Sequence, residues 1–122
     1  MKINIAKSAG FCFGVKRAVD TVYKESSKKN VYTFGPIVHN DVVVADLERQ
    51  GFHVINDSED FKSLSEGTII IRSHGVSKAI YDEILNAGLD LVDTTCPFVR
   101  KIHKIVERES GDGRVIIIIG NN

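Results

Sequence analysis

Both cysteines and two of the four histidines of this 122-residue chain lie where a strand-like stretch of sequence gives way to a helix-like one. These four residues are Cys12, His39, His74 and Cys96. Thiolates and imidazoles bind transition metals, and imidazole N–H groups also bind anions. In an open α/β sheet the loops that follow parallel strands meet at one edge, where ligands bind. The sequence therefore predicts that these four side chains line one site.

Cys12 lies between Gly10 and Gly14, directly before a predicted helix. The glycines allow a sharp turn and a close approach of the backbone to a bulky ligand. A helix N-terminus favours the thiolate over the thiol, and Lys16 and Arg17, one turn further on, act in the same direction. The alternative is a cysteine buried between its two phenylalanine neighbours.

Cys96 repeats this arrangement at the other end of the chain. Polar residues 93–95 precede it, and Pro97 is typical of a first helical position, which places Cys96 at or near an N-cap. The wide separation of Cys12 and Cys96 fits neither a C-x-x-C redox motif nor a zinc ribbon. Two alternatives stay open: each cysteine is a small core residue, or the two form a disulfide, which the spacing does not favour.

His39 and His74 are candidates for binding an anion. His39 precedes a helix start, and His74 has Arg72 beside it. Imidazole N–H groups, combined with backbone amides at helix N-termini, suit phosphate or diphosphate. Arg72 can bind an anion or form a salt bridge within the protein. The alternative for each histidine is a surface residue, which is the interpretation we give to His53 and His103.

Two thiolates beside two anion-binding histidines suggest a metal or iron–sulfur centre next to an anionic substrate. Cubane clusters are usually held by four cysteines. Three would leave one iron open to act as a Lewis acid on a substrate oxygen. This chain supplies two, and its apolar residues 115–119 have no following helix to cover them. We therefore expect the chain to be the front part of a longer protein.

The elements that must position these residues alternate between strand and helix patterns. Strands are expected at residues 2–6, 31–34, 52–55, 68–71, 89–92 and 115–119. Helices are expected from residue 15 to a stop at Asn30, and at residues 40–50, 77–87 and 97–110, with a polar connection at 56–67. Such alternation predicts an α/β fold, a mainly parallel sheet with helices on both faces.

Composition excludes several classes of function. A hydrophobic content of 43% is enough for a packed core, and 16 basic residues balance 16 acidic ones, so no overall charge favours nucleic acid or an anionic membrane. No apolar run approaches the ~18 residues of a membrane span, and residues 1–6 do not resemble a signal peptide. The cytoplasm is the simplest compartment.

Four segments resemble the 4-hydroxy-3-methylbut-2-enyl diphosphate reductase family, the last enzymes of the non-mevalonate isoprenoid route. They are GFCFGVKRA at 10–18, GPIVHN at 35–40, SHGV at 73–76 and DTTCPFV at 93–99. Their order and approximate spacing match from end to end. The resemblance covers this whole chain but less than half of a typical member. It implies three similar α/β domains around a central cavity that holds a [4Fe-4S] cluster.

The resemblance also implies roles for individual residues. Cys12 and Cys96 would be two of the three cysteine ligands of the cluster, and His39 and His74 would bind the substrate's diphosphate. The residues implied to line the cavity around the organic part are Val15, Val38, Ser73 and Val99. Residues 1–13 would be an N-terminal strand and Cys12 loop that pack with the third domain. Residues 14–96 would form the first domain, and 97–122 would begin the second.

The family reaction is a reductive dehydroxylation that yields isopentenyl and dimethylallyl diphosphates, with electrons from a ferredoxin or flavodoxin-type carrier. The family's proton-donating glutamate and third cysteine would lie beyond Asn122. We therefore expect these 122 residues alone to be inactive. Two other hypotheses compete with this one: a stand-alone anion-binding α/β module with core cysteines, and a thiol–disulfide protein that joins Cys12 to Cys96.

Overall fold

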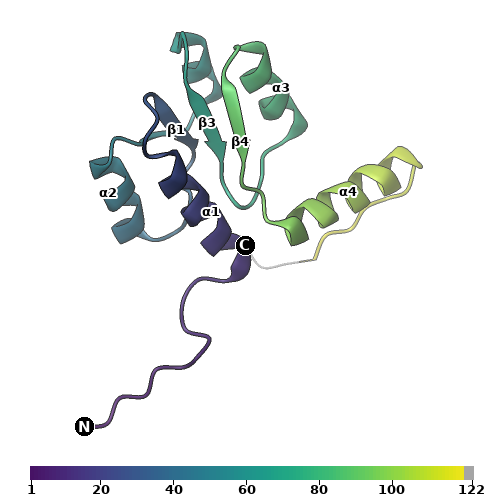
Figure 1. Cartoon of the computed structure of the whole chain (residues 1–122). Helices are drawn as coiled ribbons and strands as arrows, with labels where there is room; N and C mark the ends of the chain where they lie inside the picture. Colours follow the sequence, from purple (N-terminus) through teal and green to yellow (C-terminus); the bar gives the residue numbers. More distant parts are fainter. Residues whose placement is uncertain (120–122) are drawn as a thin grey trace.

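The computed structural model, which describes residues 1–119, contains a parallel sheet with helices on both faces (Figure 1). Its strands are β1 (Val31–Phe34), β2 (His53–Ile55), β3 (Thr68–Ile71) and β4 (Asp90–Asp93). Its helices are α1 (Phe13–Glu25), α2 (Asp41–Arg49), the 3-10 helix η1 (Ser58–Ser63), α3 (Lys78–Asn86) and α4 (Pro97–Gly111). The strand order is β2-β1-β3-β4, and every neighbouring pair is parallel. The predicted α/β class is confirmed.

Strand β3 lies at the centre of the core, and all of its residues are buried. Successive side chains of a strand point to opposite faces of the sheet. Ile70 accordingly packs with side chains of α1 and α2, whereas Ile69 and Ile71 pack with side chains of α3 and η1. A strand covered on both faces has no solvent-facing side, which explains why three consecutive isoleucines follow Thr68.

The predicted helix starts at Asn40 and Ser77 are confirmed as N-caps. The Asn40 side chain accepts a hydrogen bond from the backbone N–H of Val43 at 3.1 Å, and the Ser77 hydroxyl accepts one from Ile80 at 3.4 Å. A cap satisfies one of the backbone N–H groups that the first helical turn leaves free. Because Asn40 directly follows His39, the cap also fixes where that loop ends.

The strands predicted at residues 2–6 and 115–119 are wrong. Both segments are irregular, and both are exposed: Ile5 is 82% and Ile117 is 80% accessible. A strand needs the N–H and C=O groups of a neighbouring strand, and within residues 1–119 no strand pairs with either segment. An apolar sequence pattern indicates that a segment tends to be buried, but it does not indicate whether a neighbouring strand is available to pair with it. Residues 120–122 of the predicted second-domain segment lie outside the described residues.

The polar connection predicted at 56–67 contains η1, which the sequence did not reveal. Asp57 caps it by accepting a hydrogen bond from the N–H of Glu59 at 3.0 Å. Phe61 is 1% exposed and packs in the core beside the ring of Phe34. One buried aromatic side chain therefore holds an otherwise polar segment against the sheet.

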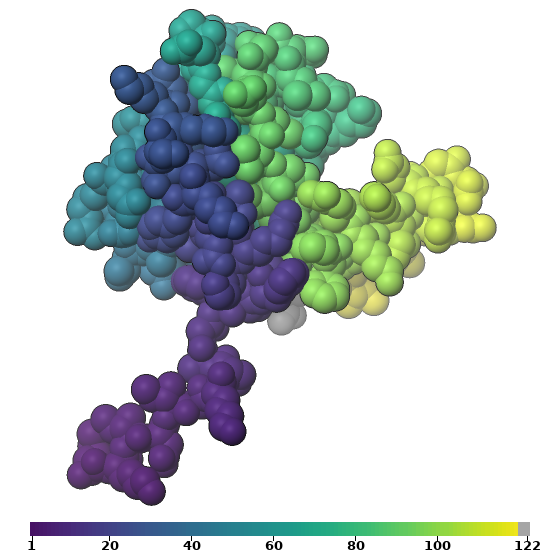
Figure 2. Space-filling view, in the orientation of Figure 1, coloured from purple at the N-terminus to yellow at the C-terminus, as the bar shows by residue number. Residues whose placement is uncertain are grey.

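Two segments project from the body of the molecule (Figure 2). The N-terminal arm before α1 extends away from the sheet, and α4 extends in a different direction (Figures 1 and 2). Helix α4 has no buried residue, and three of its apolar side chains, Phe98, Ile102 and Ile105, are 71%, 58% and 42% exposed. Among the described helices, none is long and apolar enough to cross a lipid bilayer.

Candidate functional site

The strand order places a crevice between β1 and β3. From β1 the chain passes through α2 to β2, at one edge of the sheet. From β3 it passes through α3 to β4, at the opposite edge. The connections that follow β1 and β3 therefore diverge at the carboxyl ends of these two strands, which is the usual ligand position in an open α/β sheet. These two connections, residues 35–40 and 72–77, carry His39 and His74.

His39 and His74 stack on each other at this point. Their ring centroids are 5.7 Å apart and their planes meet at 30°. Both residues are exposed, and neither ring forms a hydrogen bond with another of the described residues. The structure thus brings together two imidazoles from segments far apart in the sequence and leaves their nitrogen atoms accessible to a ligand.

The loop that carries His74 is tied to the loop that carries Cys96. The backbone N–H of Thr94 donates to the carbonyl of Ile71 at 3.1 Å, and the Thr94 hydroxyl donates to the same oxygen. The N–H of Cys96 then donates to the carbonyl of Ser73 at 2.8 Å. These bonds continue the pairing of β3 with β4 past the ends of both strands. The backbone positions of Cys96 and His74 are therefore set by one network.

Cys96 lies against the first turn of α1. A Cβ atom placed on Gly14 would be 2.5 Å from Cys96 Sγ and 2.9 Å from Cys96 Cβ. Cys12 is the N-cap of α1, and Cys96 is the N-cap of α4, as predicted. The role expected for Gly14 needs correction, because the space beside this glycine holds the Cys96 side chain rather than a ligand. Both thiols are free, with Cys12 exposed and Cys96 half-buried.

Arg17 joins α1 to the Cys96 loop, a contact that the sequence did not predict. Its Nη1 donates to the carbonyl oxygens of Thr94 at 3.1 Å and Thr95 at 3.2 Å. Lys16, by contrast, pairs with Asp20 on the surface at 2.6 Å. The two basic residues of this turn thus differ in role: one positions the loop before Cys96, and the other forms an exposed ion pair.

His103 also belongs to this region, whereas His53 does not. The Cε1 atom of His103 is 2.9 Å from the position of a Cβ on Gly75, so its ring packs on the loop of His74. His103 is exposed, as the sequence predicts, but its contact with this loop is not predicted, because a mid-helix position beside lysines does not indicate a binding site. His53 lies on β2 with its ring 5.8 Å from that of Tyr32.

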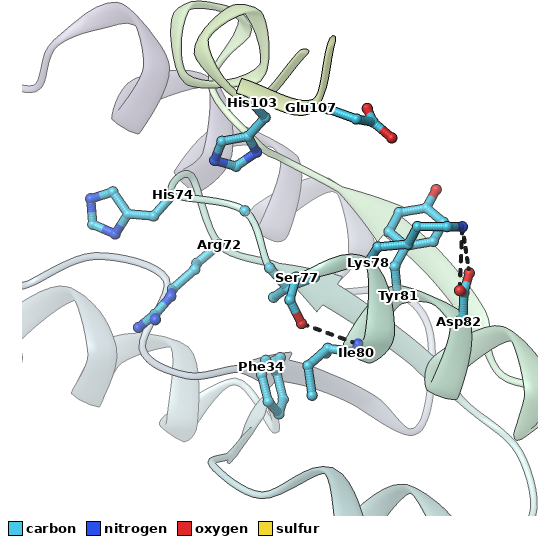
Figure 3. Close-up of a pocket in the computed structure, with 12 residues that line it drawn as sticks. Phe34, Arg72, His74, Ser77, Lys78, Ile80, Tyr81, Asp82, His103 and Glu107 are labelled. Atoms are coloured by element: carbon cyan, nitrogen blue, oxygen red, sulfur yellow. Dashed lines mark hydrogen bonds and ion pairs between the residues drawn. The ribbon is translucent and has the colours of Figure 1, made fainter. Parts of the chain in front are cut away.

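A cavity of about 890 Å³ opens beside the His74 loop, between the start of α3 and the helix α4. Figure 3 shows Arg72, His74, Tyr81, His103 and Glu107 around it. The four side chains expected to line the substrate cavity do not line this one. Ser73 is only 5% exposed, and the half-buried ones are Val15, Val38 and Val99.

The cysteine positions suit part of a metal centre. Two thiols at the starts of two helices, with Cys96 packed against the first turn of the helix that Cys12 precedes, offer soft ligands for a metal. Within residues 1–119 no group of three or more His, Cys, Asp or Glu side chains is arranged to hold a metal ion. The residues present therefore fit a share of a thiolate-held cluster but not a whole one.

The fold and the site define an α/β protein that gathers cysteines and histidines at the carboxyl edge of a parallel sheet. The family described as LytB protein matches residues 3–122. The chain belongs to the LytB family.

Similar proteins carry one activity in their names. A protein of Thermoanaerobacter sp. (strain X514) is 50% identical over 125 residues, and one of Alkaliphilus oremlandii is 47% identical over 124. Both are named 4-hydroxy-3-methylbut-2-enyl diphosphate reductase, and in both cases the match covers 99% of this chain and 43% of the relative. The chain thus spans less than half the length of these relatives.

Two solved structures have the same fold. One, described as (E)-4-hydroxy-3-methyl-but-2-enyl diphosphate reductase, the terminal enzyme of the non-mevalonate pathway, gives a TM-score of 0.81 at 37% identity over 98% of this chain and 42% of that one. The other, E-1-hydroxy-2-methyl-but-2-enyl-4-diphosphate reductase from Plasmodium falciparum, gives 0.78 at 34% identity over 87% and 33%.

Proposed function

We propose that these 122 residues form part of a 4-hydroxy-3-methylbut-2-enyl diphosphate reductase, an oxidoreductase of isoprenoid biosynthesis. The observation that carries the proposal is the stacked pair His39–His74, 5.7 Å apart, joined through one hydrogen-bond network to Cys96. It is an anion-binding group beside a soft metal ligand. Both features suit a reductase that acts on a diphosphate at a metal centre.

His39 and His74 bind the diphosphate of the substrate. Each imidazole offers an N–H donor, and the two come from the two connections that flank the crevice. Val15, Val38, Ser73 and Val99 line the part of the cavity that receives the organic chain. None of the four lines the 890 Å³ cavity beside His74, so we place them in a separate part of the site. The half-buried apolar side chains of Val15, Val38 and Val99 suit a wall that excludes water.

Cys12 and Cys96 hold two corners of a [4Fe-4S] cluster, and a third cysteine comes from sequence outside these 122 residues. Bound there, such a cluster supplies the substrate with electrons that arrive from a ferredoxin or flavodoxin-type donor. The role of this chain is to present two thiolates at helix starts, with Arg17 and Gly14 holding the Cys96 loop against α1. Free cysteines that serve as metal ligands also fit the reducing conditions of the cytoplasm.

The same proposal divides the chain by domain. Residues 14–96 form the first α/β domain, residues 1–13 pack with the third domain, and residues 97–122 begin the second. Two observations support this division: the last strand of the sheet ends at Asp93, shortly before Cys96, and both flanking segments carry exposed apolar side chains, Ile5 and Phe98 among them. These 122 residues alone are then inactive.

The test compares this chain with the complete protein that contains it, both reconstituted anaerobically with iron and sulfide. We expect the complete protein to hold iron and to form isopentenyl and dimethylallyl diphosphates with a strong reductant, and the 122-residue chain to form neither. In the complete protein, Cys12→Ser and Cys96→Ser should each lower the iron content.

Three results would contradict the proposal. Product formation by the chain alone would contradict its dependence on further sequence. Undiminished iron in both serine variants would contradict the cluster ligands and favour the stand-alone anion-binding module. A Cys12–Cys96 peptide in a nonreducing map of the native protein would favour the thiol–disulfide protein.

A further inference from the structure

We propose that Arg72 supplies the permanent positive charge at the diphosphate-binding end of the site, acting beside His39 and His74. This inference rests on the proposed function. It concerns the residue that sets affinity for the diphosphate group, which neither the resemblance nor the relatives' names identify.

Arg72 occupies a place prepared for it by a glycine. It directly follows β3, and its side chain reaches the end of β1, where Nη1 is 3.0 Å and Cζ is 3.5 Å from the position of a Cβ on Gly35. Gly35 also has φ at +70°, a conformation that other residues rarely adopt. The guanidinium therefore lies across the crevice between β1 and β3 rather than extending into solvent.

The Arg72 guanidinium has no protein partner within residues 1–119. Its Nε is buried without a hydrogen bond, and no carboxylate pairs with the group. The other arginines all have a partner: Arg17, Arg49, Arg100, Arg108 and Arg114. Arg72 as a whole is half-buried, and even a partly buried charge without a counter-ion costs free energy. A site that keeps such a charge is suited to an anionic ligand.

The charges around Arg72 point to the same kind of ligand. His74 lies two residues away, stacks on His39 and lines the same cavity as Arg72. The acidic side chains of this cavity are Asp82, which pairs with Lys78 at 3.3 Å, and Glu107. Figure 3 shows both on the opposite side from the Arg72 guanidinium. The end that holds Arg72 and His74 is therefore cationic, with room for a polyanion.

An arginine adds what the two histidines lack. Imidazole is only partly charged near neutral pH, whereas guanidinium is always charged and presents its N–H groups in a planar fork that matches phosphate oxygens. Charge-assisted, paired hydrogen bonds of this kind are also the strongest in proteins. The histidines would orient the diphosphate through their N–H groups. Arg72 would supply a positive charge that does not depend on the histidines.

The test measures binding of inorganic diphosphate to the complete, cluster-loaded protein. Arg72→Met keeps the aliphatic stem and removes the charge, and Arg72→Lys keeps the charge without the fork. Removing a charged hydrogen-bond donor should weaken binding about 10- to 100-fold for Arg72→Met, with an intermediate loss for Arg72→Lys. The KM for the substrate should rise by a similar factor while kcat changes little. Arg49→Met, an exposed arginine paired with Asp46 on α2, is the matched control and should bind like the wild type.

The outcomes separate this inference from the proposed function. If the wild type neither binds diphosphate nor turns over substrate, both are overturned. If the wild type does both and Arg72→Met binds diphosphate equally well, only the role of Arg72 is overturned. If Arg72→Met loses the visible absorption of its cluster together with its affinity, Arg72 has a structural role and the inference again fails. The inference would be supported if the Kd of Arg72→Met for diphosphate depends less steeply on salt concentration than that of the wild type, while its absorption spectrum is unchanged.

Discussion

Single atoms decide how close the residues of this site come to one another. Gly14 is the clearest case, because the hydrogen on its α-carbon leaves room for Cys96 Sγ, which a methyl group would meet at 2.5 Å. Real Cβ atoms do not approach a sulfur atom so closely, so Cys96 or α1 would have to move. The position of this thiol thus depends on a residue that carries no functional group.

Gly14→Ala should therefore damage the site more than an ordinary glycine substitution. We expect a loss of about 1–3 kcal/mol in the free energy of unfolding, as for other overpacked positions, and a lower iron content of the complete protein after anaerobic reconstitution. Gly111→Ala is the control, since nothing lies within 4 Å of a Cβ at that position. Thermal unfolding and iron analysis of both variants would measure the effect. Equal results for the two would refute the argument.

The sequence predicted part of this site but not its contacts. Cysteine and histidine carry recognisable chemistry, so Cys12, His39, His74 and Cys96 could be selected by residue type and by their place between strand and helix. Arg17 and His103 could not. Their roles depend on what a tertiary contact brings against them: the carbonyl of Thr94 in one case and Gly75 in the other. Such tertiary contacts cannot be predicted from residue type alone.

Helices α1 and α2 lie on the same face of the sheet and are joined by one side-chain hydrogen bond. The Tyr23 hydroxyl of α1 donates to Asp46 Oδ2 of α2 at 2.7 Å. This hydrogen bond, together with the negative charge of Asp46, raises the pKa of Tyr23 above its ordinary value. Because Cys12 is the N-cap of α1 and His39 directly precedes the N-cap of α2, the bond helps to fix the two helices that follow these parts of the site.

The Tyr23–Asp46 bond should give stability that disappears in alkali. A group whose pKa is higher in the folded state stabilises the fold below its unfolded pKa and loses that contribution as the pH rises through the folded value. The wild type should therefore exceed Tyr23→Phe in stability at pH 8, and the difference should shrink above about pH 10. Urea unfolding of both proteins at several pH values measures this difference, in which the titration of the lysines cancels. A difference that is constant with pH would contradict the assignment.

Sequence patterns predicted secondary structure correctly where the interactions that form it are local. The helix starts predicted at Asn40 and Ser77 are confirmed, because a capping side chain acts within its own helix turn. The strands predicted at 2–6 and 115–119 failed because strand formation depends on a distant partner. The parallel order of the sheet followed from the alternation of strands and helices, which is a property of the connections.

The molecule as a whole exposes more apolar surface than its core requires. Helix α4 turns Phe98 and Ile102 to solvent, and Ile3 and Ile5 of the N-terminal arm are also exposed. Large exposed apolar patches usually mark surfaces that pack against another protein segment. The proposed division into domains assigns these surfaces to contacts within a longer polypeptide.

Ile102→Lys should therefore act in opposite ways in two settings. In the 122-residue chain Ile102 is 58% exposed, so the change should leave the free energy of unfolding within about 0.5 kcal/mol and reduce the binding of a hydrophobic dye. In the complete protein the same charge would be buried at a domain contact and should cost about 1–3 kcal/mol. Asn86→Lys, at an exposed position on α3, adds the same charge and should be neutral in both. Equal effects of Ile102→Lys in the two settings would contradict the proposed domain contact.

The hydrogen bonds from Thr94 and Cys96 to Ile71 and Ser73 also have a thermodynamic consequence. They make the two ends of the site one mechanical unit, so a ligand that orders either end reduces the entropy that the other end still has to lose. In the proposed reductase such coupling would be reciprocal: inorganic diphosphate would change iron retention by the same factor by which the iron centre changes diphosphate binding. Titrating each in the presence and absence of the other would measure that factor twice.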